Sequence, residues 1–390
     1  QRVHAVFGLG DLQRAVLVLD EPGPARAELA DAGFVLDLTG FSASEIEGLL
    51  DAIEKTEPSA EEDTSALVRD PDEDDVTPPT VAVTRPGDLW LLGEHRLLCA
   101  DSRDAPAVAR LLEGERAHLL FTSPPYANQR DYTTGGIADW DALMQGVFGA
   151  ARAALREDAQ LLVNLGLVHR DNEWQPYWDG WIEWMRSQGW RRFAWYVWDQ
   201  GPGLPGDWNG RLAPSFEFVF HFNRKDSEAR RPNKFVPCIY AGRDTHLRGD
   251  GTSAGGMRNK DGSKTAWNHV GQVTQETKIP DSVIRIMRHK GKIGQDIDHP
   301  AVFPVALPQF VLESYTDAGE LVFEPFCGSG TTLLAAERIG RKVRATEIAP
   351  EYVDVAVKRF QQNFPEVPVT LAATGQTFDA VSRERLGGAA

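Results

Sequence analysis

Cysteine is scarce in this sequence of 390 residues, which has three: Cys99, Cys238 and Cys327. An odd number without metal-ligand spacing supports neither a disulfide framework nor a zinc site, so we expect no metal. Long apolar runs are missing as well, since no stretch approaches the roughly 18 apolar residues that a membrane-spanning helix needs. The first residues show no charged-then-apolar signal pattern. The sequence therefore predicts no membrane association and, by default, a cytoplasmic location.

Positive charge is also in short supply, because 41 Lys and Arg face 57 Asp and Glu and leave a net charge of -16. The excess acid lies at the front, where residues 1–100 hold 21 acidic and 7 basic side chains. Residues 224–298 instead hold 15 basic and 9 acidic side chains. A charge run is most often a solvated face. The basic segment nevertheless leaves room for a nucleic-acid partner, whose phosphates attract positive charge.

The apolar fraction of 42% is enough to bury the core of one large domain with appendages. Residues 1–56 indicate a small α/β piece, and residues 57–86, rich in Glu, Asp, Pro and Thr, indicate an acidic linker. The chain begins at Gln1 rather than at methionine, which suggests that a segment precedes it.

Strands alternate with helices from residue 87 onward, which is typical of a mostly parallel sheet covered on both faces. This rhythm covers residues 87–222, breaks over a loop-rich insertion at 223–298, and returns at 299–366 before a C-terminal tail at 367–390. The expected strands are 97–99, 118–122, 160–165, 193–198, 215–222, 321–326 and 343–347. The expected helices end near 114, span 140–155, 175–187, 304–315 and 331–339, and follow Pro350. We therefore predict a Rossmann-like α/β domain with a seven-stranded sheet.

A glycine turn follows the strand expected at 321–326. Residues 323–332 read Phe-Glu-Pro-Phe-Cys-Gly-Ser-Gly-Thr-Thr, and Gly328 and Gly330 let the backbone approach a ligand at the carboxyl edge of the sheet. The spacing is not the dinucleotide pattern, and no Lys follows the glycines to hold a triphosphate. Alone, such a turn is as often only a tight connection. Glu347, at the end of the next strand, can accept hydrogen bonds from ribose hydroxyls and so favours a cofactor site.

A pair of prolines ends the strand expected at 118–122. Residues 121–126 read Phe-Thr-Ser-Pro-Pro-Tyr. Adjacent prolines fix φ and remove two backbone donors, so the carbonyls of Ser123 and Pro124 are free to accept hydrogen bonds. Tyr126 offers an aromatic face for stacking. The alternative is a loop stiffened by proline, which is the commoner meaning of a bare Pro-Pro-aromatic segment.

Residues 122–126, followed far downstream by residues 324–332, resemble the amino-DNA methyltransferases, in the permuted class whose catalytic motif precedes the cofactor motif. His299, Pro300 and Pro304 are similar to the cofactor-side helix motif of that family, and residues 215–222 resemble the strand that follows its catalytic motif. The resemblance implies the permuted methyltransferase sheet, S-adenosylmethionine as cofactor and double-stranded DNA as substrate.

The resemblance also implies the site residues. The catalytic residues would be Ser123, Pro124, Pro125 and Tyr126. The cofactor-binding residues would be Asp101, Thr122, Glu324, Pro325, Phe326, Gly328, Gly330, Thr331 and Glu347. Asp101 occupies the position at which the family has an acidic residue at a strand end, near the cofactor adenine. A role as a helix cap is an equal alternative for Asp101.

The implied chemistry starts from an exocyclic amine, which is a poor nucleophile because its lone pair is delocalised into the ring. The Ser123 hydroxyl and the Pro124 carbonyl would accept hydrogen bonds from its protons, and Tyr126 would stack on a base flipped out of the duplex. Methyl transfer is then a direct in-line displacement from the sulfonium without an enzyme nucleophile. Phe326 would add a cation–π contact to that sulfonium.

Ser123 favours N4 of cytosine as the target, because the adenine N6 enzymes of the family usually carry Asp before the two prolines. Adenine N6 is the alternative. A glutamine or RNA amino methyltransferase is a rival, as is a non-catalytic ParB-like DNA-binding protein with a decayed methylase part. The Pro237-Cys238 pair suggests cytosine C5 methylation as another alternative, because the C5 enzymes use a Pro-Cys nucleophile. The order of the motifs and the Ser-Pro-Pro-Tyr segment argue against it. Cys238 is then a small core residue.

The insertion is the expected target-recognition element. Five of its basic side chains could meet phosphates or guanine edges, although each singly is more often a solvated surface residue. They are Arg243, Arg248, Arg258, Lys260 and Lys264. At the front, residues 34–41 resemble the end of the ParB-like modules fused to some methyltransferases. A cognate restriction enzyme and a homodimer are the further partners predicted.

Overall fold

The computed structural model describes residues 78–126, 140–203, 206, 208–224, 230–245, 252, 255–267, 270–288 and 303–387. All of them belong to one compact unit, Arg69–Ala390. The N-terminal piece expected over residues 1–56, Arg248 and the His299-Pro300 pair lie outside the described residues.

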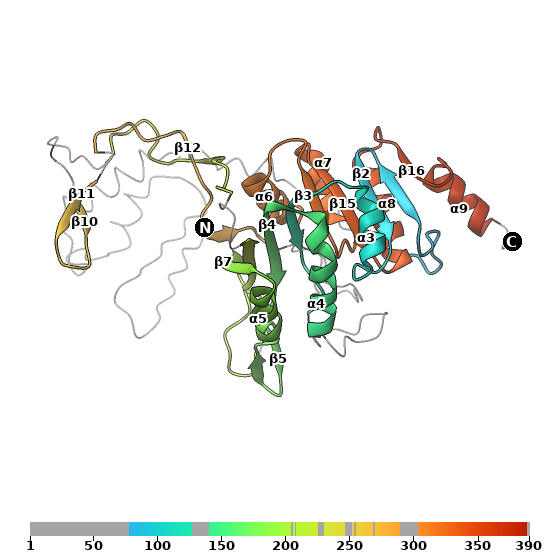
Figure 1. Ribbon diagram of the computed structural model, residues 1–390, viewed down its shortest axis with the longest axis horizontal. Coiled ribbons are helices and arrows are strands. Elements are labelled where there is room, and N and C mark those ends of the chain that lie inside the picture. Colours follow the sequence, from blue (N-terminus) through green and yellow to red (C-terminus); the bar gives the residue numbers. More distant parts are fainter. Residues whose placement is uncertain are drawn as a thin grey trace, which may run out of the picture. The chain divides into compact units, whose positions relative to one another are not determined.

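Ten strands of the described residues form one mixed sheet (Figure 1). In spatial order they are β13 (Val283–Arg285), β7 (Trp190–Asp199), β8 (Phe216–Arg224), β4 (Leu155–Leu165), β3 (Ala117–Thr122), β14 (Leu321–Glu324), β15 (Lys342–Glu347), β2 (His95–Cys99), β1 (Leu89–Leu92) and β16 (Val369–Leu371). The seven from β7 to β2 are the seven that the sequence predicts, and the α/β class is confirmed. The other three have four residues or fewer, too few for a recognisable periodicity.

Parallel pairing brings distant chain segments to one edge of the sheet. Strand β14 lies between β3 and β15 and runs parallel to both, with Val322 opposite Leu119 on one side and Val343 on the other. All four residues of β14 are buried, as expected for a strand covered on both faces. Because the carboxyl ends of parallel strands meet at one edge, the loops after β2, β3, β14 and β15 converge there.

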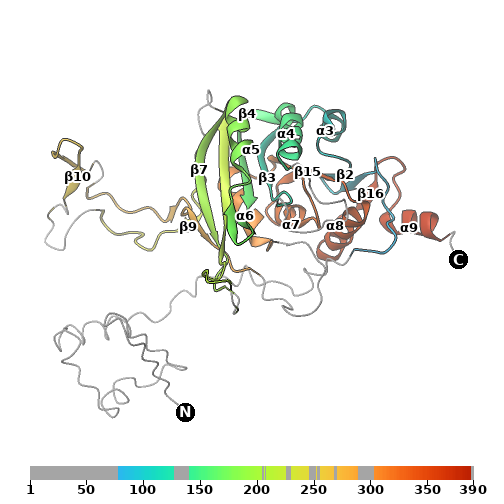
Figure 2. The same ribbon diagram turned by 90° about the horizontal axis from the view of Figure 1, so that it is seen from below.

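Helices cover both faces of the sheet (Figure 2). One layer contains α3 (Ala105–Leu112), α4 (Trp140–Ala151) and α5 (Asp179–Ser187), and the other contains α6 (Ala306–Tyr315), α7 (Thr331–Arg338) and α8 (Pro350–Asn363). Each layer buries its own apolar cluster against the sheet, around Trp181 in the first and Phe360 in the second. A short 3-10 turn, η4 (Arg152–Ala154), follows α4, and a hairpin of β5 (Val168–Arg170) and β6 (Glu173–Gln175) precedes α5. None of the helices in this part of the chain is both long and apolar enough to cross a membrane.

Two segments that the sequence places outside the domain contribute to it. In the expected tail, β16 pairs with β1, and α9 (Phe378–Leu386) packs Phe378 against Trp90 with ring centroids 5.2 Å apart. In the expected linker, Val83 is 4% exposed, and its N–H donates to the Asp354 carboxylate on α8 at 2.6 Å. Both contacts join residues about 270 or more positions apart, so no local pattern reveals them.

The insertion expected at 223–298 carries only short strands among its described residues. β9 (Val236–Pro237) pairs with β12 (Thr277–Lys278), and β10 (Gly256–Arg258) pairs with β11 (Lys264–Ala266). β13 joins the main sheet beside β7. These strands leave most of the insertion's described side chains exposed.

Candidate active site at the carboxyl edge of the sheet

The Ser-Pro-Pro-Tyr segment follows β3 directly. Thr122 at the strand end is fully buried, whereas Ser123 and Tyr126 are partly exposed. The Pro125 carbonyl accepts a hydrogen bond from Trp140 Nε1 at 2.7 Å. Among the described residues, none donates to the carbonyl of Pro124. This carbonyl is therefore available to a donor from a ligand.

Two other strands hold the Tyr126 side chain. Its hydroxyl donates to Glu217 Oε2 at the start of β8 over 2.7 Å, and Ser123 Oγ lies 3.5 Å from it. At Gly166, a Cβ would come 2.6 Å from the Tyr126 ring, so only glycine leaves room for the ring there. Burial and the charge of Glu217 raise the pKa of Tyr126 well above its usual value. The hydroxyl therefore keeps its proton at neutral pH.

The glycine turn joins β14 to α7 and lies against β15. Gly328 and Gly330 have φ of 53° and 82°, the left-handed region that glycine adopts without steric cost. A Cβ on Gly330 would come 2.8 Å from the Ala356 Cβ, so this turn packs closely on α8. The N–H of Cys327 donates to the Thr346 carbonyl of β15 at 3.0 Å.

A buried arginine supports this turn, and the sequence reasoning missed it. Arg359 on α8 is 2% exposed and donates to the Ser329 carbonyl at 2.6 Å and to Thr331 Oγ1 at 3.2 Å. A buried charge needs such partners, because leaving water is costly. The available signal was its position three residues after Ala356, on the apolar face of the predicted helix.

Glu324 joins the two motifs. The Thr122 hydroxyl donates to its Oε1, as does the N–H of Phe326, and the Thr332 hydroxyl donates to its Oε2 at 2.9 Å. Glu324 is 1% exposed, and burial raises its pKa to about 8 despite these donors. Thr122 and Glu324 were both predicted to bind cofactor, but their polar groups bind each other beneath the surface. Their polar groups are therefore occupied within the protein.

Glu347 and Asp101 lie at the edge of the sheet, Glu347 as the last residue of β15 and Asp101 just after β2. Glu347 accepts the N–H groups of Gly328 at 2.8 Å and of Ala349 at 3.0 Å, and burial raises its pKa. It is partly exposed, so lone pairs remain for ligand hydroxyls. Burial acts to raise the pKa of Asp101, but hydrogen bonds from Arg103 outweigh it and lower the pKa. The helix-cap alternative for Asp101 is wrong, because the N-cap position of α3 is held by Asp104, whose side chain makes no capping hydrogen bond.

The other predicted cofactor residues form the inner side of the turn. The Pro325 carbonyl accepts hydrogen bonds from the hydroxyls of Ser102 and Thr346. Phe326 is partly buried, and Thr331 is buried with its hydroxyl bound to Arg359. Of the predicted cofactor residues, all of which lie in the described part of the chain, Gly328, Phe326, Glu347 and Asp101 are the partly exposed ones.

Four of the five predicted DNA-contacting side chains lie in the described part of the insertion, and these four are exposed. Arg258 and Lys264 lie opposite each other on the β10–β11 hairpin, with Lys260 in its turn. Arg243 lies over the ring of Tyr240, 5.9 Å from the centroid. In the described part of the chain, none of these four side chains forms a hydrogen bond with the Ser-Pro-Pro-Tyr segment.

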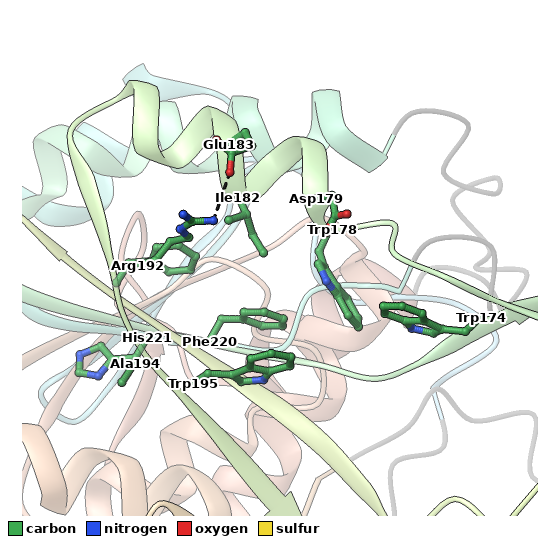
Figure 3. A pocket seen from close by; sticks show the side chains of 11 residues that line it. Trp174, Trp178, Asp179, Ile182, Glu183, Arg192, Ala194, Trp195, Phe220 and His221 are labelled. Atoms are coloured by element: carbon green, nitrogen blue, oxygen red, sulfur yellow. Dashed lines mark hydrogen bonds and ion pairs between the residues drawn. The ribbon is translucent and has the colours of Figure 1, made fainter.

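A cavity of about 650 Å³ lies between α5 and the strands β7 and β8 (Figure 3). Its wall is mostly aromatic and includes Trp174, Trp178, Trp195 and Phe220. It contains no residue of either motif, so it is separate from the predicted site. Cys238, the other feature singled out for chemistry, is half-buried in the insertion rather than in the core, and its N–H donates to the Glu276 carbonyl at 2.8 Å.

Comparison with known families finds two matches within the chain. A model of the N6/N4 class described as DNA methylase matches residues 117–358. A model described as the ParB-methyltransferase HTH domain matches residues 27–86, which include the segment expected to be an acidic linker.

Individual relatives are also methyltransferases. The orphan methyltransferase M.BamHII of Bacillus amyloliquefaciens is 32% identical over 154 residues, which are 37% of this chain and 54% of that protein. The type II methyltransferase M.Cfr9I of Citrobacter freundii is 25% identical over 299 residues, 66% of this chain and 86% of that protein. Among solved structures, PvuII DNA methyltransferase (cytosine-N4-specific) aligns with 75% of this chain and 91% of its own, at 19% identity and a TM-score of 0.47.

The DNA methylase match covers more than half of the chain and contains both motifs, from the strand before Ser123 to the helix after Glu347. It confirms the resemblance drawn from those motifs, and with it DNA as the substrate and S-adenosylmethionine as the cofactor. The chain belongs to the N6/N4 family of DNA methylases.

Proposed function

We propose that this methylase transfers a methyl group to N4 of cytosine in double-stranded DNA. The observation that carries the proposal is the pair of acceptors at the end of β3. The Ser123 hydroxyl is partly exposed, and the Pro124 carbonyl beside it has no donor among the described residues. These two groups can accept the two protons of one amino group.

The residues at the sheet edge fit S-adenosylmethionine, which supplies the methyl group as a sulfonium when bound. A Cβ on Gly328 would meet no atom within 4 Å, so the turn has an open side for a ligand. Glu347 beside it keeps lone pairs for ribose hydroxyls, and Asp101 lies at the end of the neighbouring strand. The partly buried ring of Phe326 offers a face to a positive charge.

The chain's own groups bind and orient the base. Hydrogen bonds from the amine to Ser123 and Pro124 favour tetrahedral geometry at nitrogen and free its lone pair. The Tyr126 ring, fixed by Glu217 and by the space at Gly166, provides the stacking surface for a flipped base. The hydrogen bond between Thr122 and Glu324 keeps this loop beside the cofactor turn.

Ser123 supports cytosine over adenine, because the adenine enzymes of the family usually carry Asp before the two prolines. Adenine N6 is the second candidate, since the same acceptors suit its amine. The basic insertion, whose Lys and Arg side chains would meet phosphates, and the matched HTH domain both support a duplex partner. A cytoplasmic location, a cognate restriction enzyme and a homodimer stay predictions from the sequence.

The test is to express the chain in cells that lack other DNA methylases and to analyse their DNA. Mass spectrometry of the nucleosides distinguishes N4-methylcytosine from N6-methyladenine, and single-molecule sequencing gives the sequence context. We expect N4-methylcytosine, absent in cells that express Ser123→Ala. N6-methyladenine would shift the assignment to the second candidate, and an unmodified genome would contradict both.

A further inference from the structure

Glu217 holds the Tyr126 hydroxyl, and it is also a carboxylate within reach of the predicted catalytic segment. It is the second residue of strand β8, and its Oε2 accepts a hydrogen bond from the Tyr126 hydroxyl at 2.7 Å. Asn164 of β4 donates from Nδ2 to the same oxygen at 3.0 Å and to the Phe218 carbonyl at 3.1 Å. Three segments of the chain therefore meet at one carboxylate.

The hydrogen bonds around Tyr126 run in one direction. A carboxylate only accepts, so the Tyr126 proton is directed to Glu217. The Tyr126 oxygen keeps its lone pairs, and Ser123 Oγ lies 3.5 Å away, a separation that typically shortens when substrate binds. When Ser123 donates to Tyr126, its own lone pairs are left for the substrate amine. The direction of these hydrogen bonds, from Ser123 to Tyr126 to Glu217, thus makes Ser123 an acceptor toward the substrate amine.

Asn164 holds Glu217 at an energetic cost. Its side chain is 1% exposed, and among the described residues no donor reaches its Oδ1. A buried acceptor without a partner costs about 1–3 kcal/mol. The two bonds from Nδ2 fix the amide in the orientation that leaves Oδ1 unpaired. Such a cost is typical of a group held in place for function.

Methylation of an amine releases a proton, and the Ser-Pro-Pro-Tyr segment has no base to take it. Serine and tyrosine hydroxyls are too weakly basic at neutral pH, and burial together with the Glu217 charge keeps Tyr126 protonated. Glu217 is the carboxylate that contacts the segment. Within the described residues, Tyr177 is a further titratable group that acts on Tyr126, and its phenol is as weak a base as that of Tyr126.

We propose that Glu217 is the final acceptor of the amine proton, which reaches it through Ser123 and Tyr126. This inference depends on the proposed function. The new N–C bond forms as the methyl–sulfur bond breaks, and that bond's electron pair stays on sulfur. The amine proton passes to Ser123 Oγ, the Ser123 proton to Tyr126, and the Tyr126 proton to Glu217. The products are a neutral methylamine, a neutral thioether and a protonated Glu217, which then loses its proton to solvent. Glu217 acts through Tyr126 and is a positioning residue.

The test measures single-turnover methylation of a DNA duplex by the wild type, Glu217→Gln, Tyr126→Phe and the double variant. Glutamine keeps an oxygen that accepts from Tyr126 and Asn164 but does not take up a proton. We expect Glu217→Gln to lower the rate about a hundredfold or more and to remove the acidic limb of the pH–rate profile. Tyr126→Phe should lose as much, and the double variant no more than either single change. Calorimetric affinity for S-adenosylmethionine should stay within about twofold, since neither residue contacts the cofactor turn.

The control is Glu173→Gln, which removes an exposed carboxylate on β6 and should leave the rate unchanged. A Glu217→Gln rate close to that of the wild type, a surviving acidic limb, or additive losses in the double variant would overturn the relay. Should Glu217→Gln fail to fold, Glu217→Asp replaces it, and it should be slower but keep the acidic limb. A folded Glu217→Asp without that limb also overturns the relay. A wild type that methylates no amine of DNA overturns the proposed function as well, whereas a working wild type matched by Glu217→Gln overturns the relay alone.

Discussion

The Thr122 hydroxyl donates a hydrogen bond to the Glu324 carboxylate, and the two residues lie 202 positions apart in the sequence. Thr122 immediately precedes the predicted catalytic segment, and Glu324 begins the predicted cofactor turn. Parallel pairing of β3 with β14 places them side by side. The bond therefore fixes the distance between the two motifs, which a methyl transfer between them requires.

Replacing Glu324 with Gln should change how stability depends on pH. Burial raises the pKa of Glu324 from 4.5 to about 8, so between these values the folded chain holds a proton that the unfolded chain has released. The free energy of unfolding of the wild type then falls as pH rises through this window. Glu324→Gln lacks this titration. Between pH 5 and pH 8 its free energy of unfolding should therefore fall by about 1 kcal/mol or more less than that of the wild type. Urea unfolding at both pH values measures it, and an equal loss in both proteins would contradict the pKa direction.

Replacing Ser123 with Ala should abolish methylation without weakening cofactor binding. The change removes one of the two proposed acceptors for the amine, whereas the predicted cofactor turn belongs to another segment. We expect the single-turnover rate to fall about a hundredfold or more, with calorimetric affinity for S-adenosylmethionine unchanged. Ser282→Ala, which removes an exposed hydroxyl beside β13, is the matched control. Undiminished turnover in Ser123→Ala would remove the catalytic assignment.

Replacing Gly330 with Ala should weaken both stability and cofactor binding. The new Cβ would come 2.8 Å from Ala356 Cβ, and a φ of 82° is unfavourable for alanine. We expect a loss of about 1–3 kcal/mol in the free energy of unfolding, together with a weaker affinity for S-adenosylmethionine. Gly149→Ala in α4 is the control, because its Cβ would meet no atom within 4 Å and its φ is ordinary. Equal behaviour of the two variants would show that the turn tolerates a side chain.

Replacing the basic residues of the insertion should weaken DNA binding in a salt-dependent way. The combined change R243A, R258A, K260A and K264A removes four exposed positive charges. A plot of log affinity against log salt concentration has a negative slope. For each of the four side chains that meets a phosphate, its removal should make that slope less steep by about 0.9. The control removes four exposed charges of the main domain, Arg85, Arg116, Lys358 and Arg383. A larger effect from the control set would place the DNA on another surface.

The sequence by itself determined the fold class, the seven central strands and the two motifs. Apolar runs followed by Gly or Pro mark strand ends at Thr122 and Glu324, and such signals are local, within a few residues of the feature. The short edge strands β1 and β16 and the packing of Val83 had no such signal, because they depend on partners far along the chain.

The tertiary structure alone decided which polar groups bind one another in the interior and which are left partly exposed at the edge of the sheet. Thr122 and Glu324 carry the family pattern, yet they bind each other in the interior. Arg359 and Glu217, in contrast, looked like ordinary members of a helix and a strand, and they hold the glycine turn and Tyr126. The reason is geometric: a hydrogen bond depends on distance and direction in space, and sequence spacing fixes these only within one element, not between elements joined by the sheet.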